Sequence, residues 1–159
     1  ETLAGAGFDA IPNYTAHEQP ASGMFRLLSG RAPMHTFGRT TNNRFLGSVY
    51  GENEVWINAD AAKSLGGFEE KPLADGEYVI LENQDGVRSN RVRARVTQRI
   101  RGDAVFLVHG WGHTARGLGF AKGRGASDSE LTTRYATDPV MGGTGMNVNF
   151  VRVLRVEGA

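Results

Sequence analysis

The sequence predicts a mainly β fold, a closed or nearly closed barrel of about six short strands with a few short helices and long loops. Three observations lead to this prediction. The 22 glycines among 159 residues favour tight turns and loops over long helices. The apolar runs are short, and no strand–helix–strand rhythm typical of parallel α/β sheets is present. A hydrophobic content of 40% with 22% charged residues indicates one globular domain with a real core.

Composition also excludes several classes of function. The chain has no cysteine, which rules out a disulfide, a thiolate metal site and a cysteine nucleophile. A formal net charge of +1 produces no strong overall electrostatic field that would attract nucleic acid or a membrane surface. No apolar run approaches the roughly 20 residues of a membrane span, so we expect no direct membrane insertion. No signal peptide is visible. Because the chain opens on Glu1 without a methionine, we expect a processed chain or an excised piece of a longer one.

The first part of the chain divides into a lead-in and the start of the barrel. Residues 1–22 carry two prolines and no hydrophobic period, which predicts an extended lead-in or linker before a barrel domain at 23–159. The apolar run at 23–28 predicts the first strand. Either Thr40 or Thr41 is then expected to cap a short helix that ends near Gly47.

The middle of the chain alternates strands with tight turns. A short strand is expected at 55–57, and Asn58 is a good N-cap for a helix over 59–65 that Gly66 and Gly67 terminate. A further strand at 77–82 reaches the turn at 83–86, where Asp-Gly favours a hairpin.

The returning strand shows a clear period of two. Valine and alanine alternate with Arg91, Arg93 and Arg95, which predicts one apolar face and one arginine face. The continuous apolar run at 104–108 predicts a strand buried on both faces.

The last third is dominated by a long polar, glycine-rich segment at 110–147 without a strand pattern. Within it, Ser127 and Glu130 match a capping box, so we expect a short helix to about Tyr135. The final strand is predicted at 149–156. A loop of this length in a compact domain usually serves function.

The loop at 29–43 is the first candidate site. It is rich in hydrogen-bond donors, and Arg31 and Arg39 are suited to phosphate oxygens, while Gly30 and Gly38 permit a close backbone approach. A polyanionic or polyhydroxylated ligand is therefore one interpretation. A solvated surface loop is the other.

Two further candidates lie in the long polar segment. In His109-Gly110-Trp111-Gly112-His113 the two histidines are four apart, but that spacing converges on a metal only in a helix, so a turn that contacts a ligand is favoured. The stretch at 123–128 precedes a helix and suits an anion or a polar ring edge, or is ordinary capping.

The arginine-striped strand is the last candidate. Its stretch at 88–95 suits nucleic acid or a solvated or partner-facing surface. We favour such a surface because the net charge is only +1 and aromatic interleaving is sparse. No Walker loop, dinucleotide fingerprint or Ser-His-Asp arrangement is present, so the chain has the character of a ligand-holding barrel.

The order of these motifs resembles one known domain family. The segments that carry the resemblance are 25–31, His35-Thr36, Asn42-Asn43, 55–62, Asp75-Gly76, 85–88, 105–110 and 148–153. Together they resemble the C-terminal molybdopterin-dinucleotide-binding domain of the dimethyl-sulfoxide-reductase family over residues 22–157. The resemblance is greatest to the catalytic subunits of polysulfide and thiosulfate reductases, with respiratory arsenate reductases second.

The resemblance implies a six-stranded double-psi β-barrel that helps to hold bis-molybdopterin guanine dinucleotide with molybdenum or tungsten. It implies no catalytic residue and no metal ligand within this chain, so the fragment alone should be inactive. The whole enzyme would reduce a sulfur compound by two electrons. The implied cofactor-binding residues are Ser29, Gly30, Arg31, His35, Thr36, Asn43, His109, Gly110, Trp111, Gly112, Ser127, Asp128 and Asn149. We expect Arg31, His35, His109 and Asp128 to share one concavity.

The same resemblance implies partners outside this chain. These are upstream domains with the cysteine metal ligand and an iron–sulfur cluster, an iron–sulfur electron-transfer subunit and a membrane anchor subunit, on the periplasmic or extracytoplasmic side. A stand-alone double-psi barrel that binds a partner or a substrate is the alternative, although such a module has little need of the long segment at 110–147.

Overall fold

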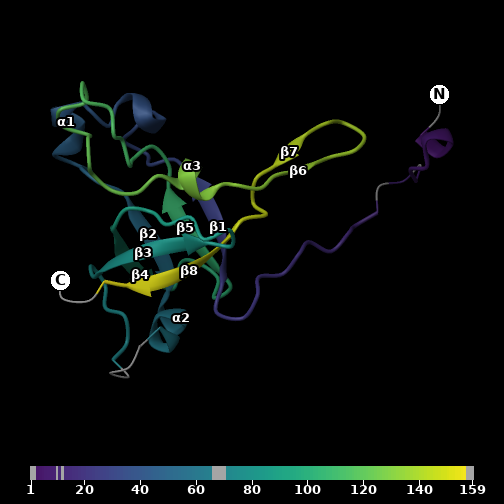
Figure 1. Cartoon of the computed structure of the whole chain (residues 1–159), viewed down its shortest axis with the longest axis horizontal. Helices are drawn as coiled ribbons and strands as arrows, with labels where there is room; N and C mark the ends of the chain where they lie inside the picture. The colour runs from purple at the N-terminus through teal and green to yellow at the C-terminus, as the bar shows by residue number, and fades with distance from the viewer. Residues whose placement is uncertain (1–2, 10, 12, 66–70, 157–159) are drawn as a thin grey trace.

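Six strands of the chain close into one barrel. The computed structural model describes residues 3–9, 11, 13–65 and 71–156. In order around the barrel the strands are β1 (Phe25–Gly30), β5 (Ala104–Val108), β2 (Glu54–Asn58), β4 (Val92–Thr97), β3 (Tyr78–Asn83) and β8 (Phe150–Arg155) (Figure 1). The prediction of a mainly β fold with a six-stranded closed barrel is confirmed.

The strand order mixes parallel and antiparallel neighbours. β1 runs parallel to β5, and β2 runs parallel to β4, while β5 and β2 pair antiparallel between them. β3 joins β4 and β8 by antiparallel pairing. The barrel closes where β8 meets β1 over two residue pairs. This order carries the end of β5 next to the end of β1, which is where the polar loops begin.

The interior of the barrel is filled by the apolar residues of alternating strand positions. Val55 and Ile57 of β2 and Val105 and Leu107 of β5 have no exposed surface. Their neighbour Trp56 faces the outside, where its ring meets Phe106 edge to face at 5.6 Å between ring centres. The alternation predicted for β4 is also found, with Val92 and Ala94 buried and the arginines outward.

The outward arginines of β4, and Arg91 immediately before it, contact local groups. Arg93 lies 3.2 Å from Glu52, Arg95 lies 4.0 Å from Glu54, and Arg91 covers the ring of Tyr78. Two arginines of the stripe therefore lie near carboxylates and a third lies over an aromatic ring.

Two short helices begin at asparagines. Asn58 caps α2 (Ala59–Ser64) as predicted, and the glycines expected to end it at 66 and 67 lie outside the described residues. The cap of α1 (Arg44–Gly47) is Asn43, so the prediction of Thr40 or Thr41 is wrong. Those hydroxyls serve other partners, because Thr40 binds His35 and Thr41 donates to the Gly38 carbonyl.

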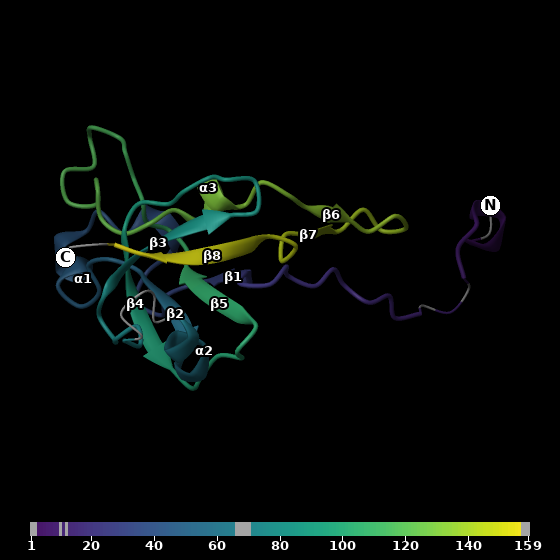
Figure 2. The same cartoon turned by 60° about the horizontal axis from the view of Figure 1, so that its bottom comes forward.

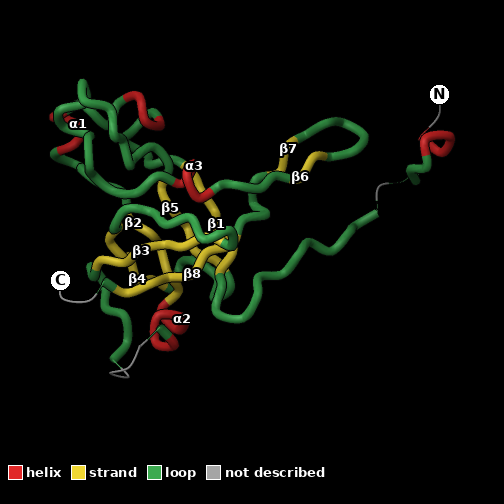
Figure 3. Tube along the Cα trace, in the orientation of Figure 1, coloured by secondary structure: helices red, strands yellow, loops and turns green. Residues whose placement is uncertain are grey.

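The long segment before β8 contains more structure than predicted. Ser127 caps α3 (Asp128–Leu131), as expected, but α3 ends four residues before Tyr135. It ends early because the backbone N–H groups of Thr133 and Arg134 donate to the side-chain amide oxygen of Asn149. A hairpin of β6 (Ala136–Thr137) and β7 (Thr144–Gly145) then projects from the barrel, contrary to the prediction of no strand there (Figure 3).

Two further one-turn elements are η1 (Leu3–Ala6), near the N-terminus, and η2 (Phe37–Arg39), in the loop between β1 and α1. The stretch that precedes β1 runs away from the barrel, on the side where the β6–β7 hairpin also projects (Figure 2). In the part of the chain that is described, no helix has the length and apolarity to cross a membrane.

Candidate functional site

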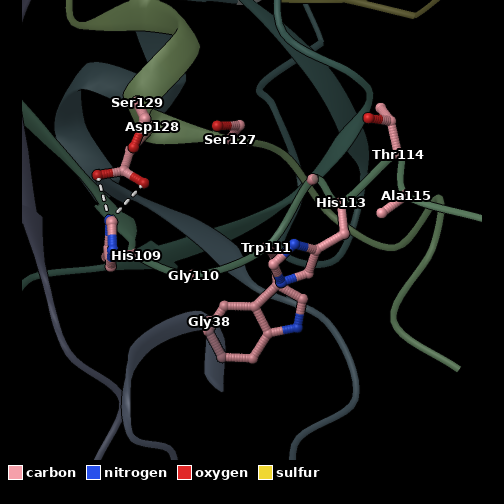
Figure 4. A pocket seen from close by; sticks show the side chains of 11 residues that line it. Gly38, His109, Gly110, Trp111, His113, Thr114, Ala115, Ser127, Asp128 and Ser129 are labelled. Carbon is pink, nitrogen blue, oxygen red and sulfur yellow. Dashed lines mark hydrogen bonds and ion pairs between the residues drawn. The ribbon is translucent and has the colours of Figure 1, made fainter. Parts of the chain in front are cut away.

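A cleft opens where three polar loops meet beyond the end of β5. Its volume is about 390 Å³. It is lined by Gly38, residues 109–115 and residues 127–129, which come from parts of the chain up to 91 positions apart (Figure 4). Volumes of this size are typical of sites that hold a small molecule or one end of a larger one.

Glycines allow the three loops to touch. Gly110 has φ +107°, and a Cβ there would lie 2.7 Å from the Gly38 nitrogen. Gly112 has φ +79°, and a Cβ there would lie 2.4 Å from the Ser127 nitrogen. Side chains at these two positions would push the loops apart, so the glycines build the walls of the cleft.

Asn53 joins the loops from beneath. Its side chain has no exposed surface, and its amide nitrogen donates to the carbonyls of Val108 at 2.6 Å and Ala126 at 2.8 Å. Its amide oxygen accepts from the Ala126 nitrogen at 2.9 Å. Asn53 thereby fixes the residues that immediately precede His109 and Ser127. Sequence reasoning missed it, because its partners lie 55 and 73 residues away.

His109 and Asp128 form the central polar pair of the cleft. Both carboxylate oxygens of Asp128 lie 2.8 Å from Nδ1 of His109, and the Asp128 side chain is 7% exposed against 34% for His109. An ionised carboxylate only accepts, so Nδ1 carries the proton and donates it. The Nε2 atom of His109 has no partner within the described parts of the chain. Asp128 therefore acts behind the imidazole, instead of presenting its oxygens to a ligand.

A second imidazole is oriented in the opposite sense. The hydroxyl of Thr41 donates to the Gly38 carbonyl at 2.9 Å, so it accepts from Nε2–H of His113 at 3.0 Å. Nδ1 of neutral His113 is then an acceptor. The described residues contain no group of three or more metal-ligating side chains, so these two histidines belong to no larger cluster.

Arg31 lies outside the cleft lining and is linked to it by an aromatic ring. Its guanidinium carbon lies 5.4 Å from the centre of the Phe37 ring, and that ring meets His109 edge to face at 5.3 Å. Among the described residues Arg31 has no carboxylate partner, so its donors remain available for an anion.

His35 supports the loop from inside. It is 6% exposed, and its ring nitrogens lie 3.1 Å from the Thr40 hydroxyl and 2.9 Å from the Tyr50 carbonyl. Its ring packs edge to face on Trp111 at 5.1 Å, and Tyr50 packs on the same indole. Burial, followed by the nearby Glu54 carboxylate, raises the pKa of Tyr50 to about 12.

The structure thus brings part of the predicted set together. Six of these residues line the cleft, namely His109, Gly110, Trp111, Gly112, Ser127 and Asp128. Arg31 and His35 are not among the lining residues, and only contact rings beside the cleft, those of Phe37 and Trp111. Of the four residues expected to share one concavity, only His109 and Asp128 therefore do so.

The remaining predicted residues have their side chains or backbone engaged in the fold. Ser29 and Gly30 pair with β5, and the Thr36 nitrogen donates to Thr40. Asn43 caps α1, and Asn149 is buried among the loops after α3. These five are not among the residues that line the cleft. Lining residues that the prediction did not include are Gly38, His113, Thr114, Ala115 and Ser129.

Comparisons with known proteins place this barrel in a family. The family model described as "Molydopterin dinucleotide binding domain" matches residues 25–150, which include every residue of the cleft. A comparison with curated proteins returns no match. Among solved structures, acetylene hydratase from Pelobacter acetylenicus matches with a TM-score of 0.67 and 15% identity.

That structural match covers 97% of this chain and 22% of the hydratase, so this chain spans about a fifth of the length of that protein. At this identity the likeness shows a common fold. The family match, in contrast, spans well over half of the chain. The protein therefore belongs to the molybdopterin dinucleotide-binding domain family.

Proposed function

We propose that this chain forms one wall of the cofactor site in a larger molybdoenzyme, and that its cleft holds part of a molybdopterin guanine dinucleotide. The observation that carries the proposal is the imidazole of His109, which the buried Asp128 holds with Nε2 unpartnered among the described residues at a cleft of about 390 Å³. The cleft lies wholly within the span of the family match.

The groups around the cleft fit a phosphate or the polar edge of a purine. Arg31 offers guanidinium donors, and His109 offers Nε2 as an acceptor when neutral or as a donor when charged. The hydroxyls of Thr114, Ser127 and Ser129 line the same space. When bound, the metal of the cofactor supplies the redox or Lewis-acid chemistry, and this chain binds and orients the nucleotide end.

For the whole enzyme we propose two-electron reduction of a sulfur compound of the polysulfide or thiosulfate type, with bis-molybdopterin guanine dinucleotide as cofactor. The order of motifs along the chain supports this proposal. Acetylene hydratase has the same fold in this region, so the fold alone does not select a reaction. The upstream domains, the electron-transfer and membrane anchor subunits, and the extracytoplasmic location belong to the same proposal.

Binding of guanosine diphosphate to the full chain tests the role of the cleft. Ligand-observed saturation-transfer NMR detects binding in the millimolar range, which suits a fragment of the cofactor. We expect saturable binding that weakens at least about tenfold in Arg31→Ala and His109→Ala, the loss of one charged hydrogen bond. Arg152→Ala removes an exposed arginine of β8 and should bind as the wild type does.

Two outcomes would contradict the proposal. One is the absence of saturable binding to the wild-type chain. The other is binding by all three variants with the affinity of the wild-type chain, which would mean that the nucleotide binds elsewhere. The full-length gene distinguishes the two functions. A cofactor domain requires that the same reading frame also encodes the rest of the enzyme, whereas a stand-alone module does not.

A further inference from the structure

Phe37 has the only positive φ among the described residues that are not glycine, at +49°. The left-handed region is rarely occupied by bulky side chains, and such strain gathers at functional sites. Core burial gives no reason for it here, because the Phe37 side chain is among the large hydrophobic groups left exposed, at 43%. The backbone gains little from this conformation unless the position of the ring matters.

The surroundings of Phe37 show what its position controls. A Cβ on Gly110 would lie 2.7 Å from the Phe37 carbonyl carbon and 3.0 Å from its oxygen, so the backbone of Phe37 lies against the lining of the cleft. The ring of Phe37 contacts two groups, with the Arg31 guanidinium 5.4 Å from its centre and the His109 ring at 5.3 Å.

Both neighbours of the ring are groups suited to an anion. Arg31 has no carboxylate partner in the described chain, and Phe37 is the side chain that orients it by a cation–π contact. His109 is also held by the carboxylate of Asp128 through its Nδ1 atom. Without the ring, the long Arg31 side chain would be free to sample many rotamers above an open loop.

We propose that Phe37 is a positioning residue that holds Arg31 beside His109, so that both address the same diphosphate of a bound ligand. This inference rests on the proposed function and adds to it a residue that neither the motif pattern nor the cleft lining contains. Phe37 acts through its two neighbours and carries no hydrogen-bonding group of its own.

Three variants of the full chain separate the ring from the strain. Phe37→Tyr keeps the ring, Phe37→Leu keeps an apolar side chain without a ring, and Phe37→Gly removes both ring and strain. The first measurement needs no ligand, and is the ¹⁵N relaxation of the Arg31 Nε–H group. We expect Arg31 to be ordered in the wild type and in Phe37→Tyr, and mobile in the other two variants.

The second measurement is the affinity for inorganic pyrophosphate. We expect Phe37→Leu and Phe37→Gly to bind at least fivefold more weakly, with Phe37→Tyr within twofold of the wild type. Thermal unfolding should show that Phe37→Gly is at least as stable as Phe37→Leu, because glycine adopts the positive φ without strain. A merely structural role predicts that affinity falls in step with the unfolding temperature.

An equally ordered Arg31 in wild type and Phe37→Leu would overturn the inference, whatever the binding data show. Equal pyrophosphate affinity in all variants would overturn it as well. If the wild type binds neither pyrophosphate nor guanosine diphosphate, the proposed function fails, and the relaxation of Arg31 still decides the role of Phe37.

Discussion

Replacement of Asn53 by alanine is the sharpest test of how the cleft is built. The substitution removes three hydrogen bonds, to the Val108 carbonyl and to both the carbonyl and the nitrogen of Ala126. Val108 is 4% exposed and Ala126 is fully buried, so water does not readily replace the lost partner. Each buried group left unsatisfied costs about 1–3 kcal/mol.

Since the three groups relax in part, we expect Asn53→Ala to lower the free energy of unfolding by about 3–5 kcal/mol. A domain of this size has a stability of about 5–15 kcal/mol, so the variant should fold but with a small margin. Asn53→Asp should be worse, because a carboxylate would face two carbonyl oxygens without a proton to donate. Urea unfolding followed by circular dichroism measures both values.

Asn149 provides a matched control in the same fold. It is also fully buried, and its amide joins four backbone groups of the loops that follow α3. Asn149→Ala should therefore cost a similar free energy of unfolding. Only Asn53→Ala should also weaken nucleotide binding at the cleft. A loss below about 1 kcal/mol for Asn53→Ala would refute the reasoning, since it would mean that these bonds are not needed.

Three further predictions concern titration and backbone conformation. The hydrogen bond from the Arg134 guanidinium, with smaller contributions from neighbouring hydrogen bonds, lowers the pKa of Asp85 to about 2. The stabilisation of the fold by ionised Asp85 is therefore present above about pH 4 and is lost as the pH falls towards 2. Asp85→Asn should abolish this part of the acid unfolding followed by circular dichroism. Because the pKa of Tyr50 is raised to about 12, its neutral phenol contributes to the stability of the fold below about pH 10, and this contribution is lost between about pH 10 and 12. Absorbance at 295 nm follows the ionisation of the phenol, and Tyr50→Phe should remove this pH dependence. Gly112→Ala should cost about 2–5 kcal/mol in urea unfolding, since it combines a positive φ with a clash. Gly123→Ala, at φ +73° with open space around it, should cost only about 1–2 kcal/mol, and equal losses would contradict the clash.

The sequence was sufficient for the barrel strands because each is a short run with a local signature. The period of two in β4 and the continuous apolar run of β5 follow from which faces are buried. The cap at Asn58 and the capping box at Ser127 are equally local signals. In contrast, the early end of α3 depends on Asn149, which lies 16 residues from its partner Thr133, and no local pattern contains that information.

The site was predictable in outline for a similar reason. Glycines and polar residues marked each of the three loops that meet at the cleft, two of them after strand ends and the third before α3. The roles within it were not predictable, because they depend on contacts across long stretches of chain. Asp128 is a candidate ligand acceptor in the sequence, whereas the fold places its carboxylate behind His109. Phe37 has no polar group and gave no signal at all.

The pairing of β1 with β8, which closes the barrel, has a consequence for folding during synthesis on the ribosome. Among the described residues β8 is the last strand of the barrel to be made, and it bridges β3 to β1, with five residue pairs on one side and two on the other. Until residue 155 has emerged, the nascent sheet exposes two unpaired edges that invite association with other chains. Truncations within Phe150–Arg155 should therefore yield aggregates in place of a smaller soluble barrel.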